Sequence, residues 1–545
     1  WLTLLGMAWL TYNAWQADYG AVADRSSAPA TTNAPAATPG GSLPSLTPVD
    51  NPISTQQSPA PTTTPTVTGE LIRVRTDVLD VLIASNGGDL VRADLLQYPV
   101  QKNVPEPVVR LLDDSANERW VFQSGFRSAV GGAEPNHLGT FRTPNNDYTL
   151  APGQNELVVT LDWVGEGPIS ARKTYTFRRG HYQVDLTLTV TANGANAWRG
   201  APYVQMERVH VPVERSYTSV DSYSFKGPVL YDADGFERFE FEDLAEAPVT
   251  RNVEGGWFAA IQHHFLAAAV PPATGVYRYD AAVRGSAFQL SAIGPVADVN
   301  AAMPLNSTFK LFVGPKLQEQ LQDVGSDLER TVDYGITTPL AQPLFSVLNW
   351  VHGWVNNWGF AIIIVTIMIK AVFYKLTAMS GRSMAKMRKI APRMKALQER
   401  YKDDRQALSQ AMMELYKREK VNPAAGCLPI LIQMPFFFAF YWMLVESVEL
   451  RQAPFALWLD DLSAADPFYV LPALMAAAMW FQTRLSPAPP DPIQAKMMQI
   501  MPLVFAGLLV FFPAGLVLYQ LTNTVLSIAQ QWRINTLVAR ESATT

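Results

Sequence analysis

The residue whose type and position most invite a chemical role is Lys370, which stands inside an apolar run. It lies in AIIIVTIMIKAVF, residues 361 to 373, and the rest of that run suits lipid. Lys370 is five residues, about 7.5 Å at the rise of an α-helix, from Lys375. A charge near the bilayer centre costs at least about 3 kcal/mol on insertion scales, and less if the side chain reaches the interface. Lys370 is therefore either an anchor at the inner interface or the charge of a polar site within the membrane.

Polar residues in the neighbouring apolar segments favour the polar site. Thr366 lies one helical turn before Lys370 on the same face. Gln433 lies at a similar depth in the next apolar segment. The last segment carries a polar stripe at three- and four-residue spacing, which consists of Gln520, Asn523 or Thr524, Ser527 and Gln531. Each residue alone most often bonds neighbouring helices together, but jointly they predict a hydrated surface on the cytoplasmic side of the bilayer.

Large soft side chains accompany these polar residues. They are Met434, Phe436, Phe437, Phe438, Phe440, Tyr441 and Trp442 in one segment and Met497, Met498, Met501 and Phe505 in another. Most of them are expected to be ordinary bulk that faces lipid. Because Met and Phe surfaces adapt to many shapes, a wall of this kind beside a polar cavity also suits an amphipathic guest without a fixed sequence.

Motifs for energy coupling and catalysis are missing from the sequence. It contains no G-x-x-x-x-G-K-[ST] loop for phosphate, no H-E-x-x-H for zinc and no G-x-S-x-G nucleophile. His263 and His264 are two adjacent histidines in an apolar stretch, and we expect them to have a structural role. A membrane Ser/Lys peptidase needs its lysine near the outer surface, whereas Lys370 is near the inner one. We expect no catalytic residue, metal site, cofactor or enzymatic activity.

The elements that position these residues follow from a change of composition along the 545-residue chain. Residues 71–340 mix polar and apolar types and carry 23 Lys and Arg against 32 Asp and Glu, a balance of −9. From Ala341 onward, apolar stretches approach the roughly 20 residues that a crossing helix needs. The single cysteine, Cys427, rules out an internal disulfide. The chain is predicted to be an α-helical polytopic membrane protein with one large water-soluble domain.

The water-soluble part shows a period of two. In HYQVDLTLTV, residues 181–190, apolar and polar residues alternate, and Gly, Pro and Asn turns separate many such runs. We predict an antiparallel β-sandwich over about 71–315. KLQEQLQDVGSDLERTV then predicts a helix that leads back to the membrane, and the aromatic, amphipathic stretch 344–359 predicts a helix in the interface.

A basic segment separates the first two apolar segments of the membrane half. Apolar residues recur at three- and four-residue spacings within 382–423, which predicts two amphipathic helices joined near Lys402-Asp403-Asp404 as an antiparallel hairpin. The loop 377–422 holds 12 Lys and Arg against 5 Asp and Glu, a balance of +7, so it is expected in the cytoplasm. Counting crossings from there places both termini inside and the acidic β-domain in the periplasm of a Gram-negative bacterium.

The N-terminal region allows two interpretations. WLTLLGMAWLTYNAW begins without methionine, so we expect a trimmed natural start. The following Ala-Val-Ala at 21–23 fits a signal-peptide cleavage site. Trp9, Tyr12 and Trp15 instead fit the interfacial belt of an uncleaved anchor, which we favour. The next residues are rich in Ala, Pro, Thr and Ser and predict a flexible tether.

These patterns give the following predicted parts, in chain order. They are an N-terminal anchor at 1–20, a tether at 21–70, a periplasmic β-sandwich at 71–325, connecting and interfacial helices at 326–357, a second crossing at 358–376, a cytoplasmic hairpin at 377–423, crossings at 427–447 and 467–484, a cytoplasmic loop at 485–496, crossings at 497–511 and 514–532, and a cytoplasmic tail at 533–545. The count is six transmembrane helices.

Four stretches of the membrane half resemble the YidC family of bacterial membrane-protein insertases, which is related to the mitochondrial and thylakoid insertases. They are NNWGFAIIIVTIMIKAVFYKLT, SMAKMRKIAPRMKALQERY, NPAAGCLPILIQMPFFFAFYWML and FPAGLVLYQLTNTVLSIAQQW. They occur in the family's order and spacing over about 340–535. The anchor, tether and acidic β-domain resemble the Gram-negative branch, so the resemblance covers the whole chain.

The resemblance implies a five-helix insertase core with a hydrophilic groove that is open to cytoplasm and lipid and closed toward the periplasm. The groove centres on a basic residue, which is Lys370 here. Many relatives have arginine, so this chain keeps the charge without the planar guanidinium. Family positions that contact incoming segments correspond to Thr366, Met434, Phe437, Phe505 and Tyr519. The outer domain is expected to be a β-supersandwich related to sugar-mutarotase folds, which does not imply sugar chemistry.

The implied function is insertion of nascent transmembrane segments and assistance to their folding, alone or with the Sec translocon. The cytoplasmic hairpin, with Met387, Met394 and Met412, is expected to receive the substrate. Expected partners are nascent membrane proteins, the Sec translocon with its accessory subunits, the ribosome with the signal recognition particle pathway, and membrane lipids, but no nucleic-acid substrate. A secondary transporter would have a midplane site between internal repeats, and none is visible. An assembly chaperone without autonomous insertase activity stays open.

Overall fold

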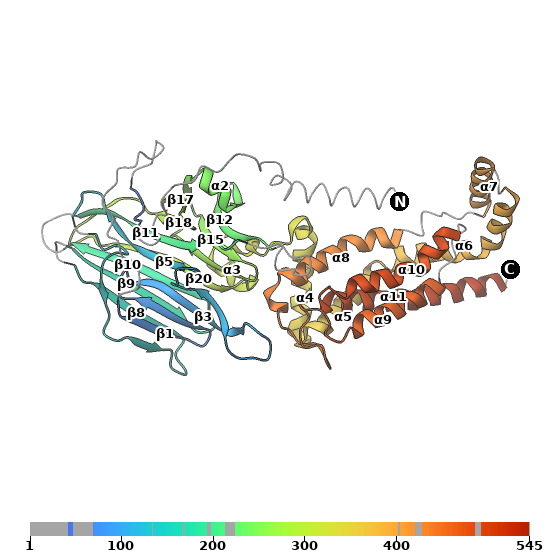
Figure 1. Cartoon of the computed structure of the whole chain (residues 1–545), viewed down its shortest axis with the longest axis horizontal. Helices are drawn as coiled ribbons and strands as arrows, with labels where there is room; N and C mark the ends of the chain where they lie inside the picture. The colour runs from blue at the N-terminus through green and yellow to red at the C-terminus, as the bar shows by residue number, and fades with distance from the viewer. Residues whose placement is uncertain are drawn as a thin grey trace. The chain divides into compact units, whose positions relative to one another are not determined.

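The structure, a computed structural model, describes residues 42–46, 69–132, 134–165, 167, 169–192, 198–212, 224–401, 404–419, 428–485 and 492–543 (Figure 1). All of these residues belong to the unit Gly40–Thr545. The predicted anchor at 1–20, most of the predicted tether and Cys427 lie outside the described residues.

The alternating sequence of residues 71–315 folds into two β-sheets that face each other across an apolar core (Figure 1). Strand β10, Gln183–Ala192, shows the reason, since its apolar residues are buried and its polar residues are only partly covered. Among the described residues, every pairing of strands is antiparallel except that of β1 with β7. The predicted antiparallel β-sandwich is confirmed.

The larger sheet has 11 described strands in the order β14-β17-β18-β11-β5-β3-β2-β1-β7, with β19 beside β11 and β4 beside β3. Their bounds in that order are Val249–Glu254, Val276–Arg284, Ala287–Ile293, Trp198–Val209, Trp120–Ser128, Asp89–Pro99, Leu79–Ala84, Leu71–Arg75, Asp147–Thr149, Ala297–Val299 and Val108–Leu112. The other sheet has 9 described strands in the order β13-β12-β15-β16-β20-β10-β9-β8-β6. Their bounds are Gly235–Arg238, Lys226–Asp232, Trp257–Gln262, Phe265–Val270, Leu305–Pro315, Gln183–Ala192, Ile169–Arg178, Glu156–Trp163 and Phe141–Arg142.

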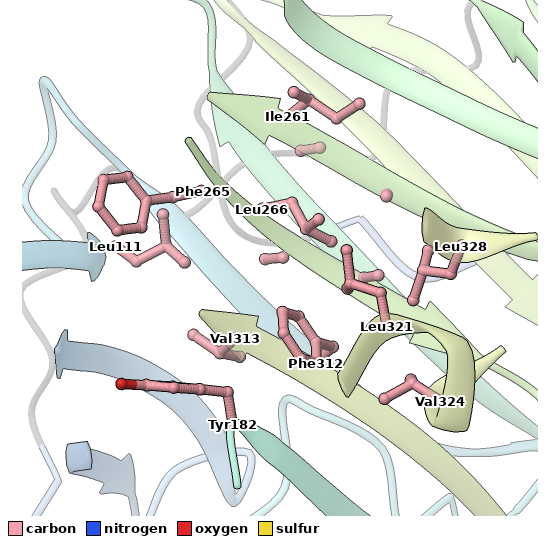
Figure 2. Close-up of a cluster of buried hydrophobic side chains, with 14 of the residues drawn as sticks. Leu111, Tyr182, Ile261, Phe265, Leu266, Phe312, Val313, Leu321, Val324 and Leu328 are labelled. Carbon is pink, nitrogen blue, oxygen red and sulfur yellow. The ribbon is translucent and has the colours of Figure 1, made fainter. Parts of the chain in front are cut away.

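Two short helices accompany the sheets, α2 at Phe241–Glu246 and α3 at Gln318–Val324. Figure 2 shows Leu321 and Val324 of α3 beside Phe312 of β20. The helix predicted over KLQEQLQDVGSDLERTV is longer than the observed α3. Helix α3 ends at Val324, because the next residue is Gly325 and glycine is a poor helix former, and a 3-10 turn follows at Leu328–Thr331.

The C-terminal part of the chain is helical. Asn357 begins one helix by accepting a hydrogen bond from the Phe360 amide at 3.1 Å. The preceding helix begins at Thr338 rather than at 344, with Pro339 in its first turn. The helices are α4 Thr338–Val355, α5 Trp358–Val372, α6 Tyr374–Arg400, α7 Arg405–Arg418, α8 Leu428–Glu446, α9 Val470–Leu485, α10 Pro492–Leu509 and α11 Ala514–Ala543. Helix α11 packs against α5, α6, α8 and α9.

The predicted crossing at 358–376 is interrupted at Phe373, where α5 and α6 meet at 69°. The hydroxyl of Thr377 donates to the carbonyl oxygens of Phe373 and Tyr374, at 3.0 and 3.1 Å. Such back-bonding by threonine bends helices. Gln530 of α11 also bonds the Tyr374 carbonyl, so the bend depends on a residue that is distant in sequence.

The described helices differ in how closely their length and hydropathy approach those of a membrane span. No helix in those ranges reaches the values of a membrane span by itself, but Trp358–Val372 and Tyr374–Met387 reach them together as a bent pair. Leu431–Glu446 and Gln499–Leu509 are shorter apolar helices.

The end of α8 contacts the β-sandwich through polar groups. His263 and His264 stack with ring centroids 3.7 Å apart, and the Nε2 atoms of both lie within 3.1 Å of the Val445 carbonyl oxygen. Ser224 donates to the Glu446 carboxylate at 2.8 Å. The histidine pair therefore has a structural contact at the joint of the two parts.

Candidate functional site

One face of α5 and the start of α6 carries Thr366, Lys370, Phe373 and Thr377, spaced by four, three and four residues. This face borders a hollow between α5, α8 and α11. The hollow has about 350 Å³ of space between protein atoms, including the part open to the outside. We call it the Lys370 groove, and its lining residues are Thr366, Ile369, Lys370, Phe373, Thr377, Ile432, Gln433, Phe436, Tyr519 and Asn523.

Lys370 is half-buried and has one hydrogen-bond partner within the described part of the chain. Its Nζ donates to Ser527 Oγ at 2.7 Å, and that hydroxyl donates to the Asn523 carbonyl oxygen at 2.7 Å. No described carboxylate lies within ion-pair distance of Lys370. Because an ammonium group has three N–H donors, the lysine keeps capacity to bind an acceptor in the groove.

The polar rim of the groove is built by contacts between helices. Gln433 Nε2 donates to Asn523 Oδ1 at 3.3 Å and so links α8 to α11. Thr366 is buried, and its hydroxyl donates to the Ile362 carbonyl at 2.7 Å within its own helix. The structure therefore brings together Thr366, Lys370, Gln433, Tyr519, Asn523 and, by hydrogen bond, Ser527.

Other predicted site residues do not line the groove. Thr524 is buried and Gln520 is half-buried. Met434, Phe437 and Phe505 are half-buried, and the Phe437 ring packs edge-on against Phe438 with centroids 5.8 Å apart. Their roles as substrate contacts stay predictions.

Of the predicted wall, the described lining of the groove contains Phe436. Phe373 and Phe436 pack edge-to-face at 5.4 Å, and Ile369 and Ile432 complete the apolar surface. Tyr519 is buried and stacks on Phe440 at 4.2 Å. Long apolar runs have no clear periodicity, so the run in α8 did not indicate which face borders the groove.

Phe373 and Thr377 were missed although a signal for them exists. Continuing the spacing of Thr366 and Lys370 by three and then four residues reaches both positions. Thr377 also accepts a hydrogen bond from Gln530 Nε2 at 2.8 Å, so its hydroxyl holds α6 to α11 at the end of the groove.

The methionines predicted to receive substrate lie between α6 and α7. Met394 is buried with Ile390, and Met387 and Met412 pack against this pair. Arg393 and Glu419 form an ion pair at 2.6 Å across the same two helices. The three- and four-residue spacing thus serves helix pairing, and a receiving role for these methionines stays a prediction.

The chemistry available in the groove is recognition of polar and anionic groups. A cation, several hydroxyls and two amides lie beside aromatic and branched side chains. Among the described residues, no cluster of three or more His, Cys, Asp or Glu could hold a metal ion. Polar and apolar surfaces therefore lie side by side in the groove.

Comparison with known proteins covers both parts of the chain. Residues 350–541 match the family model described as 60Kd inner membrane protein, and residues 71–347 match the model described as YidC periplasmic domain. The membrane protein insertase YidC of Methylococcus capsulatus is 44% identical over 533 residues, which are 97% of this chain and 96% of the relative. The protein of that name from Nitrosococcus oceani is 43% identical over 546 residues, 99% of this chain and 98% of the relative.

A solved structure, described as an active YidC insertase with the first transmembrane domain resolved, is 19% identical with a TM-score of 0.39. The similarity covers 85% of this chain and 94% of that one. The two family models and the near full-length relatives show that the chain belongs to the YidC family of membrane protein insertases.

Proposed function

We propose that this protein inserts nascent transmembrane segments into the bacterial inner membrane through the Lys370 groove. The observation that carries the proposal is an ammonium group without a carboxylate partner in the described residues, held by Ser527 between helices that are otherwise largely apolar. Family membership supports the same activity.

The groove lowers the cost of moving a polar tail into the membrane. A nascent segment enters from the cytoplasm, and its short, often acidic, leading tail rests near Lys370. Burying a charge without partners is costly, so a cation together with the amides of Gln433 and Asn523 replaces part of the tail's hydration. No covalent step is needed.

Transfer of the apolar segment into lipid supplies the driving force. It releases about 25 cal/mol for each Å² of apolar surface removed from water. Helix α10 offers an exposed apolar path beside the core, with Met501, Leu503 and Val504 at its surface. The membrane potential assists an acidic tail by about 2.3 kcal/mol per charge per 100 mV.

The proposed arrangement in the membrane has six crossings, both termini in the cytoplasm and the β-sandwich in the periplasm. The balance of +7 in the loop 377–422 supports this orientation. Proposed partners are nascent membrane proteins, the Sec translocon with its accessory subunits, the ribosome with the signal recognition particle pathway, and membrane lipids. The protein is proposed to act alone or with the translocon.

The test is insertion by the purified chain alone in liposomes, measured as protease protection of a small two-helix client. Lys370→Ala and Lys370→Glu are expected to lose at least tenfold in rate. Lys375→Ala is the matched control, because Lys375 is exposed on α6 outside the groove and its loss changes the charge equally. Full activity of both Lys370 variants would reduce Lys370 to an anchor at the interface. No insertion by the wild type would favour an assembly chaperone.

A further inference from the structure

A short piece of the predicted tether lies on the β-sandwich. Residues 42–46, Ser-Leu-Pro-Ser-Leu, were predicted to be flexible, but Leu43 and Leu46 pack against Ala201, Tyr203 and Ile293. These three residues belong to β11 and β18, next to each other in the larger sheet. The contact is therefore with one continuous sheet surface, which we call the docking face.

Three glutamines are buried on the docking face. Gln123 of β5, Gln205 of β11 and Gln289 of β18 are 3%, 1% and 7% exposed. Gln205 lies directly opposite Gln123 in the register, and Gln289 lies opposite Glu207, two residues further along the same face of β11. Amides are costly to bury unless they are hydrogen-bonded, so this row requires polar partners.

The tether segment supplies several of those partners. Gln205 Nε2 donates to the Ser42 carbonyl oxygen at 3.3 Å and to Gln123 Oε1 at 2.8 Å. Gln289 Nε2 donates to Ser42 Oγ at 3.0 Å. Arg284 Nε donates to Gln289 Oε1 at 2.7 Å, and this bond turns the NH₂ group toward Ser42.

A second carbonyl of the segment is also recognised. The Arg127 guanidinium donates to the Pro44 carbonyl oxygen, and the same side chain pairs with Glu134 at 3.3 Å. The contacts to Ser42 and Pro44 are both made to backbone carbonyl oxygens, which every residue carries. The apolar shelf of Ala201, Tyr203 and Ile293 adds a preference for branched or large apolar side chains.

The docking face keeps one acceptor that no described residue uses. Gln205 Oε1 is buried and has no hydrogen-bond partner in the described part of the chain. A buried unpaired acceptor costs about 1–3 kcal/mol. Such a group is expected where a ligand with another N–H can add a bond.

We propose that the docking face is a binding site for extended peptides and that residues 42–46 are its intramolecular ligand. Pro44 suits this role, because its ring fixes φ and it has no N–H that would need a partner. It also restricts Leu43 to extended conformations. The site recognises a serine or other small residue at the glutamines and leucine-like residues on the shelf.

Covalent linkage makes the segment an effective competitor. A ligand joined by a short flexible linker reaches an effective concentration on the order of millimolar. A free peptide of similar affinity must therefore exceed that concentration to displace it. The site becomes accessible to micromolar peptide when the segment can no longer dock.

The experiment measures binding of a fluorescein-labelled peptide GGSLPSLTP, which copies residues 40–48, to the full-length chain in detergent by fluorescence anisotropy. The double variant Leu43→Asp with Leu46→Asp places two charges against the apolar shelf and frees the site. We expect it to bind the peptide at least tenfold more tightly than the wild type. The matched control is Val211→Asp with Met303→Asp, since both residues are exposed apolar positions outside the docking face, and it should bind like the wild type.

Two further measurements separate a built site from non-specific adhesion. Adding Gln205→Leu to the open variant should weaken binding at least tenfold, and Gln289→Ala gives the same test if the first variant does not fold. The peptide GGSSPSSTP, which lacks both leucines, should not bind. Equal binding by the open variant and the wild type would overturn the proposal, as would equal binding of the two peptides.

Discussion

Replacing Lys173 with methionine tests how the β-sandwich tolerates charge in its interior. Lys173 of β9 is 1% exposed, and its Nζ donates to the carbonyl oxygens of Gly87 and Ser124 and to Ser124 Oγ. Asp89 lies 3.5 Å away. Methionine keeps most of the side-chain volume but removes all three donors and the counter-charge. Breaking a buried ion pair from one side costs about 3–5 kcal/mol.

The assay is hydrogen exchange by mass spectrometry on the full-length protein, which reports on the β-sandwich separately from the helices. For amides that exchange only by unfolding of the domain, a loss of 3–5 kcal/mol accelerates exchange by roughly two to four orders of magnitude, since each 1.4 kcal/mol is tenfold. Arg172→Met is the control on the adjacent residue. Its ion pair with Asp162 is largely exposed, so its loss should cost less than about 1 kcal/mol.

The effect of Lys173→Met should grow with pH. Burial raises the pKa of Asp89 from 3.8 to about 7, against the opposing effect of Lys173. Removing the lysine raises this pKa further. The folded-state pKa of Asp89 lies above the unfolded value in both proteins, so both lose stability as pH rises from about 4 to about 7. In the variant the loss continues through its higher folded-state pKa, so the difference between the two proteins grows above about pH 7. Adding Asp89→Asn should recover part of the loss. Equal exchange in the Lys173 and Arg172 variants at pH 8 would refute this reasoning.

Two further outcomes follow from the joint and the hairpin. Burial raises the pKa of Glu449 from 4.5 to about 7. Hydrogen exchange of peptides covering 445–450 should therefore become faster as pH rises from 5 to 8, beyond the intrinsic effect of pH on exchange. Glu449→Gln keeps an acceptor for the Gln318 amide and should remove that pH dependence. Deleting 383–420 should stop insertion in liposomes while the β-sandwich keeps its exchange pattern; full insertion by the deletion would exclude the hairpin from the reaction.

Local patterns predicted the elements of the fold where one face of an element is buried. The alternation in β10 and the polar stripe of α11 are both visible in the sequence, because periods of 2 and 3.6 reflect geometry within one segment. The stripe contains Ser527, whose hydroxyl accepts a hydrogen bond from Lys370, but the spacing did not identify that pair. The bend at Phe373 left no local signal, since it depends on Thr377 and on Gln530 from α11.

Docking of residues 42–46 was equally invisible to local reasoning. The composition of this segment correctly indicates that it has little apolar surface of its own. It does not indicate that glutamines on β11 and β18, which are 163 and 247 residues from Ser42, offer partners for its carbonyl and hydroxyl groups. Such a match depends on strand order, which no spacing within the tether reveals.

Two lysines lie in different surroundings, and we propose a structural role for one and a functional role for the other. Lys173 has three acceptors and a nearby carboxylate, so its donors are used and its charge is balanced. Lys370 has Ser527 as its hydrogen-bond partner among the described residues, and it borders a hollow with an open side. Evolution toward stability alone would fill that hollow or pair that charge, because unpaired charges near apolar surroundings are costly. The cost is explained if the missing partner arrives with each client, which is why a carboxylate on the client's leading tail should matter most when Lys370 is intact.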